Sequence, residues 1–160
     1  MLLALYSWLM AEFTLIRQMS LPLRRAQVFE FFADAGNLEK ITPPELKFHI
    51  ITPQPMKLEE GSIIEYDLRL RGFLIHWRTL ISRWDPPFEF TDEQMRGPYK
   101  QWIHRHVFTE LPNGDTSIED IVHYRLPVEP LGDLLHFMVR RELDRIFDFR
   151  QKAVTEALSA

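Results

Sequence analysis

The chain has 160 residues, of which 46 % are hydrophobic and 26 % charged, and this suits a single globular domain with its own core. Its net charge of −4, with basic residues interleaved among acidic ones, gives no basis for nucleic-acid binding or for a basic membrane-binding patch. The absence of cysteine excludes disulfides, thiolate metal sites and a cysteine nucleophile, and a reducing, cytoplasmic location is expected.

The first ten residues, MLLALYSWLM, form an apolar run that is too short to span a bilayer, which takes roughly twenty residues. The run also lacks the basic start and the small-residue cleavage site of a signal peptide. Strand-like alternation begins only after Met10. We therefore expect residues 1–10 to be a disordered or mis-started extension, residues 11–160 to form one domain, and the protein not to insert stably into a membrane.

Further along the chain, the spacing of apolar residues predicts both strands and helices. The pattern predicts a strand at residues 12–19 and a helix at residues 24–34. It also predicts a second helical turn at residues 37–41, which ends before two prolines. From Leu46 onward, period-two alternation predicts up to six strands: residues 46–51, 62–71, 73–84, 88–96, 100–111 and 115–126. After Pro130, apolar residues at helical spacing predict a helix of about seven turns that reaches residue 158.

This order of elements predicts the architecture. Short Gly- and Pro-containing separators between the strands favour an antiparallel meander. A sheet with one apolar face needs a cover, and the last helix is the only predicted element long enough to provide it. We expect an α+β fold in which a curved sheet wraps around this helix and leaves a ligand cavity between them.

Turn residues predict the register of the last three strands. Pro112-Asn113-Gly114 predicts a three-residue loop, and a second such loop is expected at residues 97–99. Counting back from the two loops places Asp92 opposite His104 and Asp120 opposite His106 on the inner face. The other residues expected on this face are Phe88, Phe90, Gln94, Trp102, Phe108, Ile118, Val122 and Tyr124, and earlier strands add Ile64, Tyr66, Leu68, Leu70, Ile75, Trp77, Thr79 and Ile81. The outer face, with Glu89, Thr91, Glu93, Arg105, Thr109, Ser117, Glu119, His123 and Arg125, is expected to face solvent.

The His104–Asp92 and His106–Asp120 pairs have two main interpretations. As structural pairs, they would satisfy each other's buried polar groups across the strands. As functional pairs, they would hold an imidazole in one tautomer, either to orient a ligand or to act as a general base. The candidate catalytic residues are therefore His104, His106, Asp92 and Asp120.

A metal site is a further alternative. The spacing His104-x-His106-x-x-x-Glu110 is similar to the first half of a cupin metal motif, but no matching second half is present. His123 falls on the predicted outer face and His136 in the predicted helix. No G-x-G-x-x-G, P-loop or G-x-S-x-G motif occurs, so the leading expectation includes no cofactor and no metal.

Several motifs together carry a family resemblance. They are Trp77-x-Thr79; Trp84-x-Pro86-Pro87-x-x-Phe90-x-Asp92-x-Gln94-x-Arg96-Gly97-Pro98-Tyr99; Trp102-x-His104-x-His106-x-Phe108; Asp120-x-Val122-x-Tyr124-x-Leu126-Pro127; and Arg140-Arg141-x-Leu143-x-x-Ile146-Phe147-x-x-Arg150. Over residues 13–158 the chain resembles the START/Bet v 1-like (SRPBCC) superfamily, in its bacterial polyketide cyclase/dehydrase-like branch. The resemblance implies a helix-grip fold, a seven-stranded sheet around the C-terminal helix with two short helices after the first strand. It also implies a deep cavity for hydrophobic molecules. Members include carriers, coenzyme Q-binding proteins and aromatase/cyclases, and some relatives are fused to a sugar-epimerase-like domain.

The expected function is binding or carriage of a small hydrophobic or aromatic molecule, such as a lipid, a polyketide or a quinone. A polyketide cyclase or dehydratase that uses a cavity His/Asp pair is the alternative, and a metal-dependent site at His104 and His106 is a third. A homodimer is left open. The expected ligand-binding residues are Tyr66, Trp77, Thr79, Phe90, Asp92, Gln94, Trp102, His104, His106, Tyr124, Leu135 and Met138.

Overall fold

The computed structural model describes residues 11–127 and 134–159, so the expectation for residues 1–10 falls almost entirely outside the described residues. The predicted order of elements is confirmed. In chain order the elements are β1 (Phe13–Leu21), α2 (Arg25–Phe32), α3 (Asn37–Lys40), the 3-10 helix η2 (Pro44–Leu46), β2 (His49–Ile50), β3 (Ile63–Leu70), β4 (Phe73–Asp85), β5 (Glu89–Arg96), β6 (Gln101–Glu110), β7 (Thr116–Arg125) and α5 (His136–Ser159).

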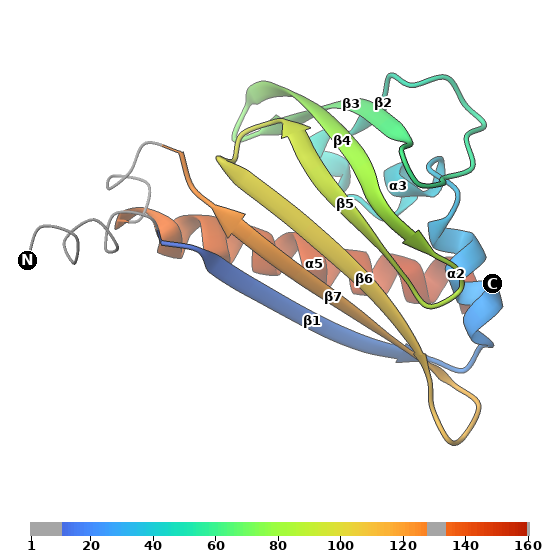
Figure 1. Cartoon of the computed structure of the whole chain (residues 1–160). Helices are drawn as coiled ribbons and strands as arrows, with labels where there is room; N and C mark the ends of the chain where they lie inside the picture. Colours follow the sequence, from blue (N-terminus) through green and yellow to red (C-terminus); the bar gives the residue numbers. More distant parts are fainter. Residues whose placement is uncertain (1–10, 128–133, 160) are drawn as a thin grey trace, which may run out of the picture.

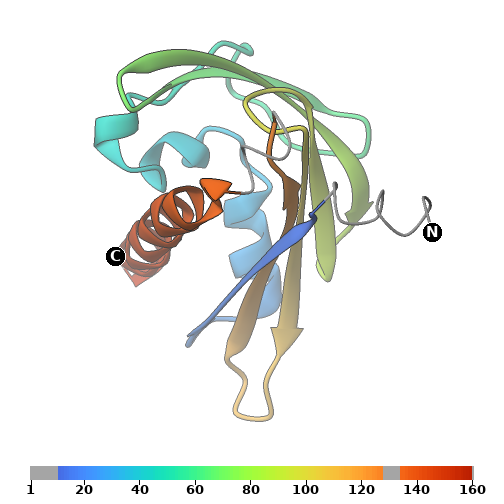
Figure 2. The same cartoon turned by 90° about the vertical axis from the view of Figure 1, so that its left-hand side faces the viewer.

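The strands form one antiparallel sheet in the order β1-β7-β6-β5-β4-β3-β2. The sheet curves, and α5 lies along its concave side, with α2 and α3 closing one end (Figure 1; the curvature is clearest in Figure 2). This is the predicted α+β arrangement of a sheet around a long C-terminal helix. None of the helices in the described part of the chain is long and apolar enough to cross a membrane.

The predicted register of β6 and β7 is confirmed. Gly114 has a φ of 85°, and its N–H donates to the carbonyl of Leu111, which closes the expected turn. His106 consequently lies opposite Asp120. The register of β5 and β6 also places Asp92 opposite His104, as predicted.

Two expected details of the sheet are wrong. The second predicted strand, at residues 46–51, is only two residues long, because Pro44 starts a 3-10 helix that ends at Leu46. The pairing of β5 with β6 stops at Glu93 and Ile103, so the three-residue loop at 97–99 does not form.

In β5, Met95 bulges out of the pairing with β4, and Ser82 does the same in β4. Such bulges bend a strand and increase its local twist.

The outer face is less exposed than expected. Glu89 is only 5 % exposed, because two arginines cover its carboxylate: Arg83 Nε lies 2.6 Å from Oε1, and Arg105 Nε donates to Oε2 at 2.8 Å. Thr91 and Ser117 on the same face are also buried. The long side chains of neighbouring arginines can cover a polar sheet face in this way.

Candidate ligand cavity and its histidine–aspartate cluster

A cavity of about 180 Å³ lies between the concave face of the sheet and α5. Its sheet side is lined by residues of β3 to β6 that alternate along each strand, as the predicted inner face requires. Its other walls come from α2, α3 and α5, with Phe32, Leu38 and Phe147 among them.

One part of the wall is made of aromatic rings in mutual contact. The rings of Tyr66 and Trp77 stack with their centroids 5.9 Å apart, and Trp77 meets Trp102 edge to face at 5.6 Å. Tyr99 closes this group, 4.8 Å from Trp102. Burial raises the pKa of Tyr66 and of Tyr99 above the ordinary value, so both hydroxyls stay protonated.

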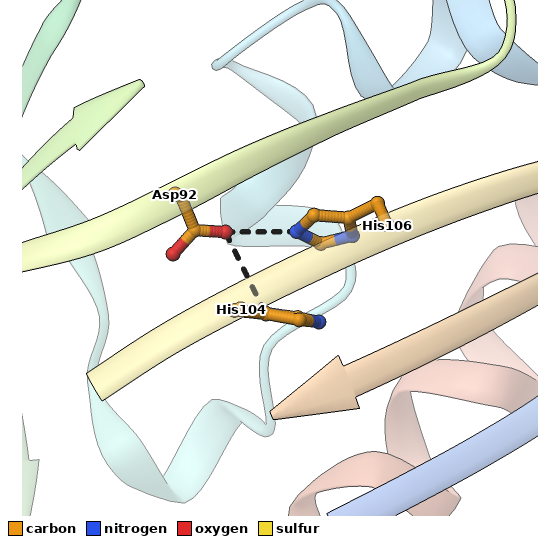
Figure 3. Close-up of side chains that lie close together, drawn as sticks. All are labelled: Asp92, His104 and His106. Atoms are coloured by element: carbon orange, nitrogen blue, oxygen red, sulfur yellow. Dashed lines mark hydrogen bonds and ion pairs between the residues drawn. The ribbon is translucent and has the colours of Figure 1, made fainter. Parts of the chain in front are cut away.

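A buried cluster of two histidines and two aspartates forms the polar end of the cavity (Figure 3 shows three of the four). His104 Nε2 hydrogen-bonds to Asp120 Oδ1 at 2.8 Å, and His106 Nε2 hydrogen-bonds to Asp92 Oδ2 at 2.8 Å. The second nitrogen of each ring faces the other carboxylate. His104 Nδ1 is 3.5 Å from Asp92 Oδ2, and His106 Nδ1 is 3.0 Å from Asp120 Oδ1 but outside hydrogen-bonding geometry.

Ring contacts hold the two imidazoles in place. Their centroids are 3.7 Å apart with the rings tilted by 34°, and the His106 ring stacks on Phe90 at 4.1 Å. The expected cross-strand pairs are therefore correct in backbone register, but the expected side-chain contacts were incomplete. Each carboxylate contacts both rings, and the hydrogen bonds to Nε2 run diagonally between strands.

Arg150 of α5 sets the charge of this cluster. Its Nε lies 4.0 Å from Asp120 Oδ2, and the arginine side chain is only 14 % exposed. Burial alone would raise the pKa of Asp120, but Arg150 and the hydrogen bonds from the two histidines outweigh burial and hold that pKa well below its usual range. The pKa of Asp92 is also lowered, because the two imidazoles and Arg150 outweigh the effect of burial.

The pKa values of the two histidines shift in opposite directions. Burial and the adjacent His106 lower the pKa of His104, despite both carboxylates. Burial also opposes charge on His106, but its contacts with Asp120 and Asp92 outweigh this and raise its pKa. With His106 protonated, two carboxylates would balance one imidazolium and one guanidinium around the neutral ring of His104 at the cavity wall.

Two donors at the cavity lack acceptors. Trp77 Nε1 and Arg150 Nε are buried and have no hydrogen-bond partner among the described residues. Both side chains line the cavity. Because an indole N–H can only donate, a cavity occupant with an acceptor atom would satisfy it.

Eight of the twelve expected ligand-binding residues line the cavity, and four do not. The eight are Tyr66, Trp77, Thr79, Phe90, Asp92, Trp102, His104 and His106. Gln94 instead binds the backbone of Tyr99, where the loop widens after the β5 bulge. Tyr124 hydrogen-bonds to His136, Leu135 is 48 % exposed, and Met138 lies before the part of α5 that faces the cavity.

The C-terminal helix was expected to line the cavity through Leu135 and Met138, but other residues of α5 lie there, and the contribution of the two shorter helices was missed. The α5 residues at the cavity are Leu143, Ile146, Phe147 and Arg150. Arg150 continues the apolar stripe of the helix, and a charged residue in such a stripe was the available signal. Glu110, from the cupin-like spacing, is not part of the cluster, because its side chain is 57 % exposed and lies 4.0 Å from Arg25.

No protein-family model matches the sequence, and no curated protein does. Solved structures do match. The Zhui aromatase/cyclase from Streptomyces sp. R1128 has a TM-score of 0.72 at 15 % identity, over 92 % of this chain and 93 % of that chain. A START superfamily protein from Mycobacterium smegmatis has a TM-score of 0.67 at 11 % identity, over 90 % and 98 %.

A third match, a nucleoside-diphosphate sugar epimerase from Corynebacterium glutamicum, is 25 % identical with a TM-score of 0.64. It covers 91 % of this chain but 29 % of that chain. These similarities agree with the sheet order and with the position of α5. The chain therefore shares the helix-grip fold of these structures, a curved antiparallel sheet around a long C-terminal helix.

Proposed function

We propose that this chain binds and carries a small apolar or aromatic molecule in the cavity between the sheet and α5. The observation that carries this proposal is a buried cavity with one aromatic wall and one polar end. Binding sites of this kind gain affinity from apolar burial, and a few fixed polar groups orient the ligand. The similarity to START and aromatase/cyclase structures supports the same class of ligand.

The size of the cavity limits the ligand. An engineered cavity of about 150 Å³ holds one benzene molecule. The cavity here, at about 180 Å³, has room for one aromatic ring with short substituents. A quinone or phenolic ring would fit inside, and a longer molecule would extend through the open side of the cavity.

The polar groups define the chemistry of the ligand. Trp77 Nε1–H and Arg150 Nε–H lack hydrogen-bond acceptors among the described residues. The lowered pKa of His104 favours a neutral ring, which has one N–H donor and one acceptor nitrogen. We infer a ligand with at least one carbonyl, phenolic or carboxylate oxygen. Donors to such an oxygen would fix its orientation.

Native mass spectrometry of freshly purified protein, followed by organic extraction, tests the proposal. We expect a co-purifying aromatic compound at near one equivalent. Empty protein would next be titrated with benzoquinone, phenol and benzene while tryptophan fluorescence is followed.

A matched pair of variants gives this titration its control. Trp102→Leu removes a ring from the cavity wall, whereas Trp84→Leu removes a ring packed on Phe29 away from the cavity. We expect Trp102→Leu to weaken binding by about tenfold and Trp84→Leu to leave it unchanged. Equal effects of both variants, or no binding of any probe, would contradict the proposal.

A cyclase or dehydratase is the second candidate, and the state of His104 favours it. The lowered pKa favours a neutral ring, and Asp120 holds it through Nε2. Its Nδ1, which faces Asp92 Oδ2 at 3.5 Å, is then the nitrogen that would accept a proton from a bound substrate. In an enzyme, His104→Ala would abolish turnover and leave binding nearly intact. In a carrier, no histidine variant would weaken binding as much as Trp102→Leu. Binding and turnover measured on the same two variants separate these functions.

A further inference from the structure

The hydrogen bonds within the histidine–aspartate cluster leave one ring nitrogen without a partner among the described residues. His106 is 3 % exposed, yet its Nδ1 has no hydrogen-bond partner among the described residues. If Nε2–H of His106 donates to Asp92, Nδ1 is left as a buried and unsatisfied nitrogen. In the other neutral tautomer of His106, the proton is on Nδ1, which lies 3.0 Å from Asp120 Oδ1. Nε2 then has a lone pair that faces the carboxylate of Asp92.

His104 presents the same arrangement. Its Nε2 contacts Asp120 Oδ1, so its bare Nδ1 faces Asp92 Oδ2 at 3.5 Å. If His106 also donated to Asp120 through Nδ1–H, its bare Nε2 and the bare Nδ1 of His104 would both face Asp92 Oδ2. A cation among these three atoms, either a proton or a metal ion, would relieve their mutual repulsion.

We propose that Asp92, His104 and His106 bind one divalent transition-metal ion, with Asp120 as the outer carboxylate that orients both histidines. Candidate ligand atoms of the three residues all lie within 4.8 Å of one another. Ligands at about 2.1 Å from an ion are roughly 3.0 to 3.4 Å apart in octahedral or tetrahedral geometry. The 2.8 Å and 3.5 Å separations from Asp92 Oδ2 to the two imidazoles bracket this range (Figure 3).

The outer carboxylate is the strongest support for the site. Metal-binding histidines generally donate their second N–H to a carboxylate or carbonyl, which fixes the tautomer and the ring orientation. One oxygen of Asp120 lies within 3.0 Å of a nitrogen on both rings. Its other oxygen, Oδ2, faces Arg150, whose Nε lies 4.0 Å away.

The charge of the site indicates what completes the coordination. A divalent ion and Arg150, set against Asp92 and Asp120, leave one excess positive charge when both histidines are neutral. All three proposed ligands line the cavity, so an anionic oxygen of a bound molecule, or a hydroxide, can fill an open position. The metal would bind phenolates, enolates or carboxylates more tightly than hydrocarbons.

Calorimetry and elemental analysis test the site on untagged, EDTA-treated full-length protein. We expect Zn²⁺ to bind at one equivalent, and Co²⁺ to give visible absorption bands characteristic of protein ligands. His104→Phe and His106→Phe keep a ring of similar size without nitrogen, and each should weaken Zn²⁺ binding by about 100-fold or more. Asp120→Asn should weaken it by about 10- to 100-fold.

His76→Ala is the matched control. His76 Nδ1 also contacts a carboxylate, that of Asp67 at 2.9 Å, but this pair is partly exposed and outside the cavity. We expect Zn²⁺ binding to be unchanged in this variant. Circular dichroism identifies a variant that fails to fold, and the two phenylalanine variants give two separate tests of the site.

Two results would overturn the proposal: no stoichiometric Zn²⁺ binding by the wild type, or binding that persists in both His104→Phe and His106→Phe. The second would assign the metal to surface groups. Ligand binding is measured separately by tryptophan fluorescence in the presence of EDTA. A failed metal site is thereby distinguished from a failed ligand-binding function.

Discussion

His104 hydrogen-bonds to Asp120 at 2.8 Å, although the residue opposite His104 on β7 is Val122. The side chain reaches diagonally along the sheet to the carboxylate opposite His106. Diagonal neighbours on one sheet face are within reach of long side chains. As a result, four titratable side chains on three strands form one hydrogen-bonded unit. Substitution or protonation of any one of them changes the hydrogen bonds and pKa values of the others.

Removal of Asp120 should destabilise the fold strongly. Asp120→Ala leaves Arg150 and the two imidazoles buried without their main counter-charge, and the expected loss in free energy of unfolding is about 3–5 kcal/mol. Asp67→Ala, which breaks the partly exposed pair with His76, should cost less than about 1 kcal/mol. Urea denaturation of both variants measures the difference. Comparable losses in the two would show that the buried cluster does not stabilise the fold.

Acid should weaken the fold through the same carboxyl group. Burial raises the pKa of Asp120, but Arg150 and the histidines lower it by more, so the folded-state pKa lies below the unfolded value of about 3.9. Ionised Asp120 therefore stabilises the fold above about pH 4, and this contribution is lost as the pH falls through the folded pKa. The free energy of unfolding should fall less steeply below about pH 4 in Asp120→Asn than in the wild type. Parallel curves would rule out this role of Asp120.

The two histidines should differ in protonation at neutral pH. In metal-free protein we expect His104 as a neutral ring with its proton on Nε2, and His106 as an imidazolium. Long-range proton–nitrogen NMR spectra separate these states, because protonated and bare ring nitrogens differ in chemical shift. Two neutral rings, or a charged His104, would contradict the charge balance described above.

The indole N–H of Trp77 should select for ligand oxygen. Trp77→Phe keeps an aromatic ring in the wall but removes the unsatisfied donor. Loss of one neutral hydrogen bond predicts weaker binding of benzoquinone by about threefold to tenfold. Benzene, which has no acceptor, should bind the variant and the wild type about equally. A similar loss for both probes would mean that the variant changes only the shape of the cavity.

The register of the inner face could be predicted because local turn chemistry fixes it. A glycine with positive φ at Gly114 sets the loop between β6 and β7, and pairing then propagates along both strands with a period of two. His104, His106 and Asp120 therefore fall on one face by counting from this turn. Asp92 was also placed correctly opposite His104, although the loop at 97–99 from which it was counted does not form. Their diagonal hydrogen bonds depend on side-chain rotamers, which counting does not reveal.

The rest of the site depends on tertiary packing. The bulge at Met95 has no sequence signal, and Gln94 beside it hydrogen-bonds to the backbone of Tyr99 instead of facing the cavity. The rotation and reach of α5 follow from how the helix meets the curved sheet. For that reason Leu135 and Met138 were expected at the cavity, whereas Phe147 and Arg150 lie there.

The position of β1 in the sheet has a consequence for biosynthesis. Among the described strands, β1 pairs with β7 alone, so that neighbours such as Thr14 and His123 are 109 residues apart in the chain. During translation, β1 has no strand to pair with until nearly all of the domain has left the ribosome. Non-local pairing of this kind slows folding and leaves unpaired strand edges exposed in the meantime. The nascent chain should therefore depend on chaperones until β7 emerges.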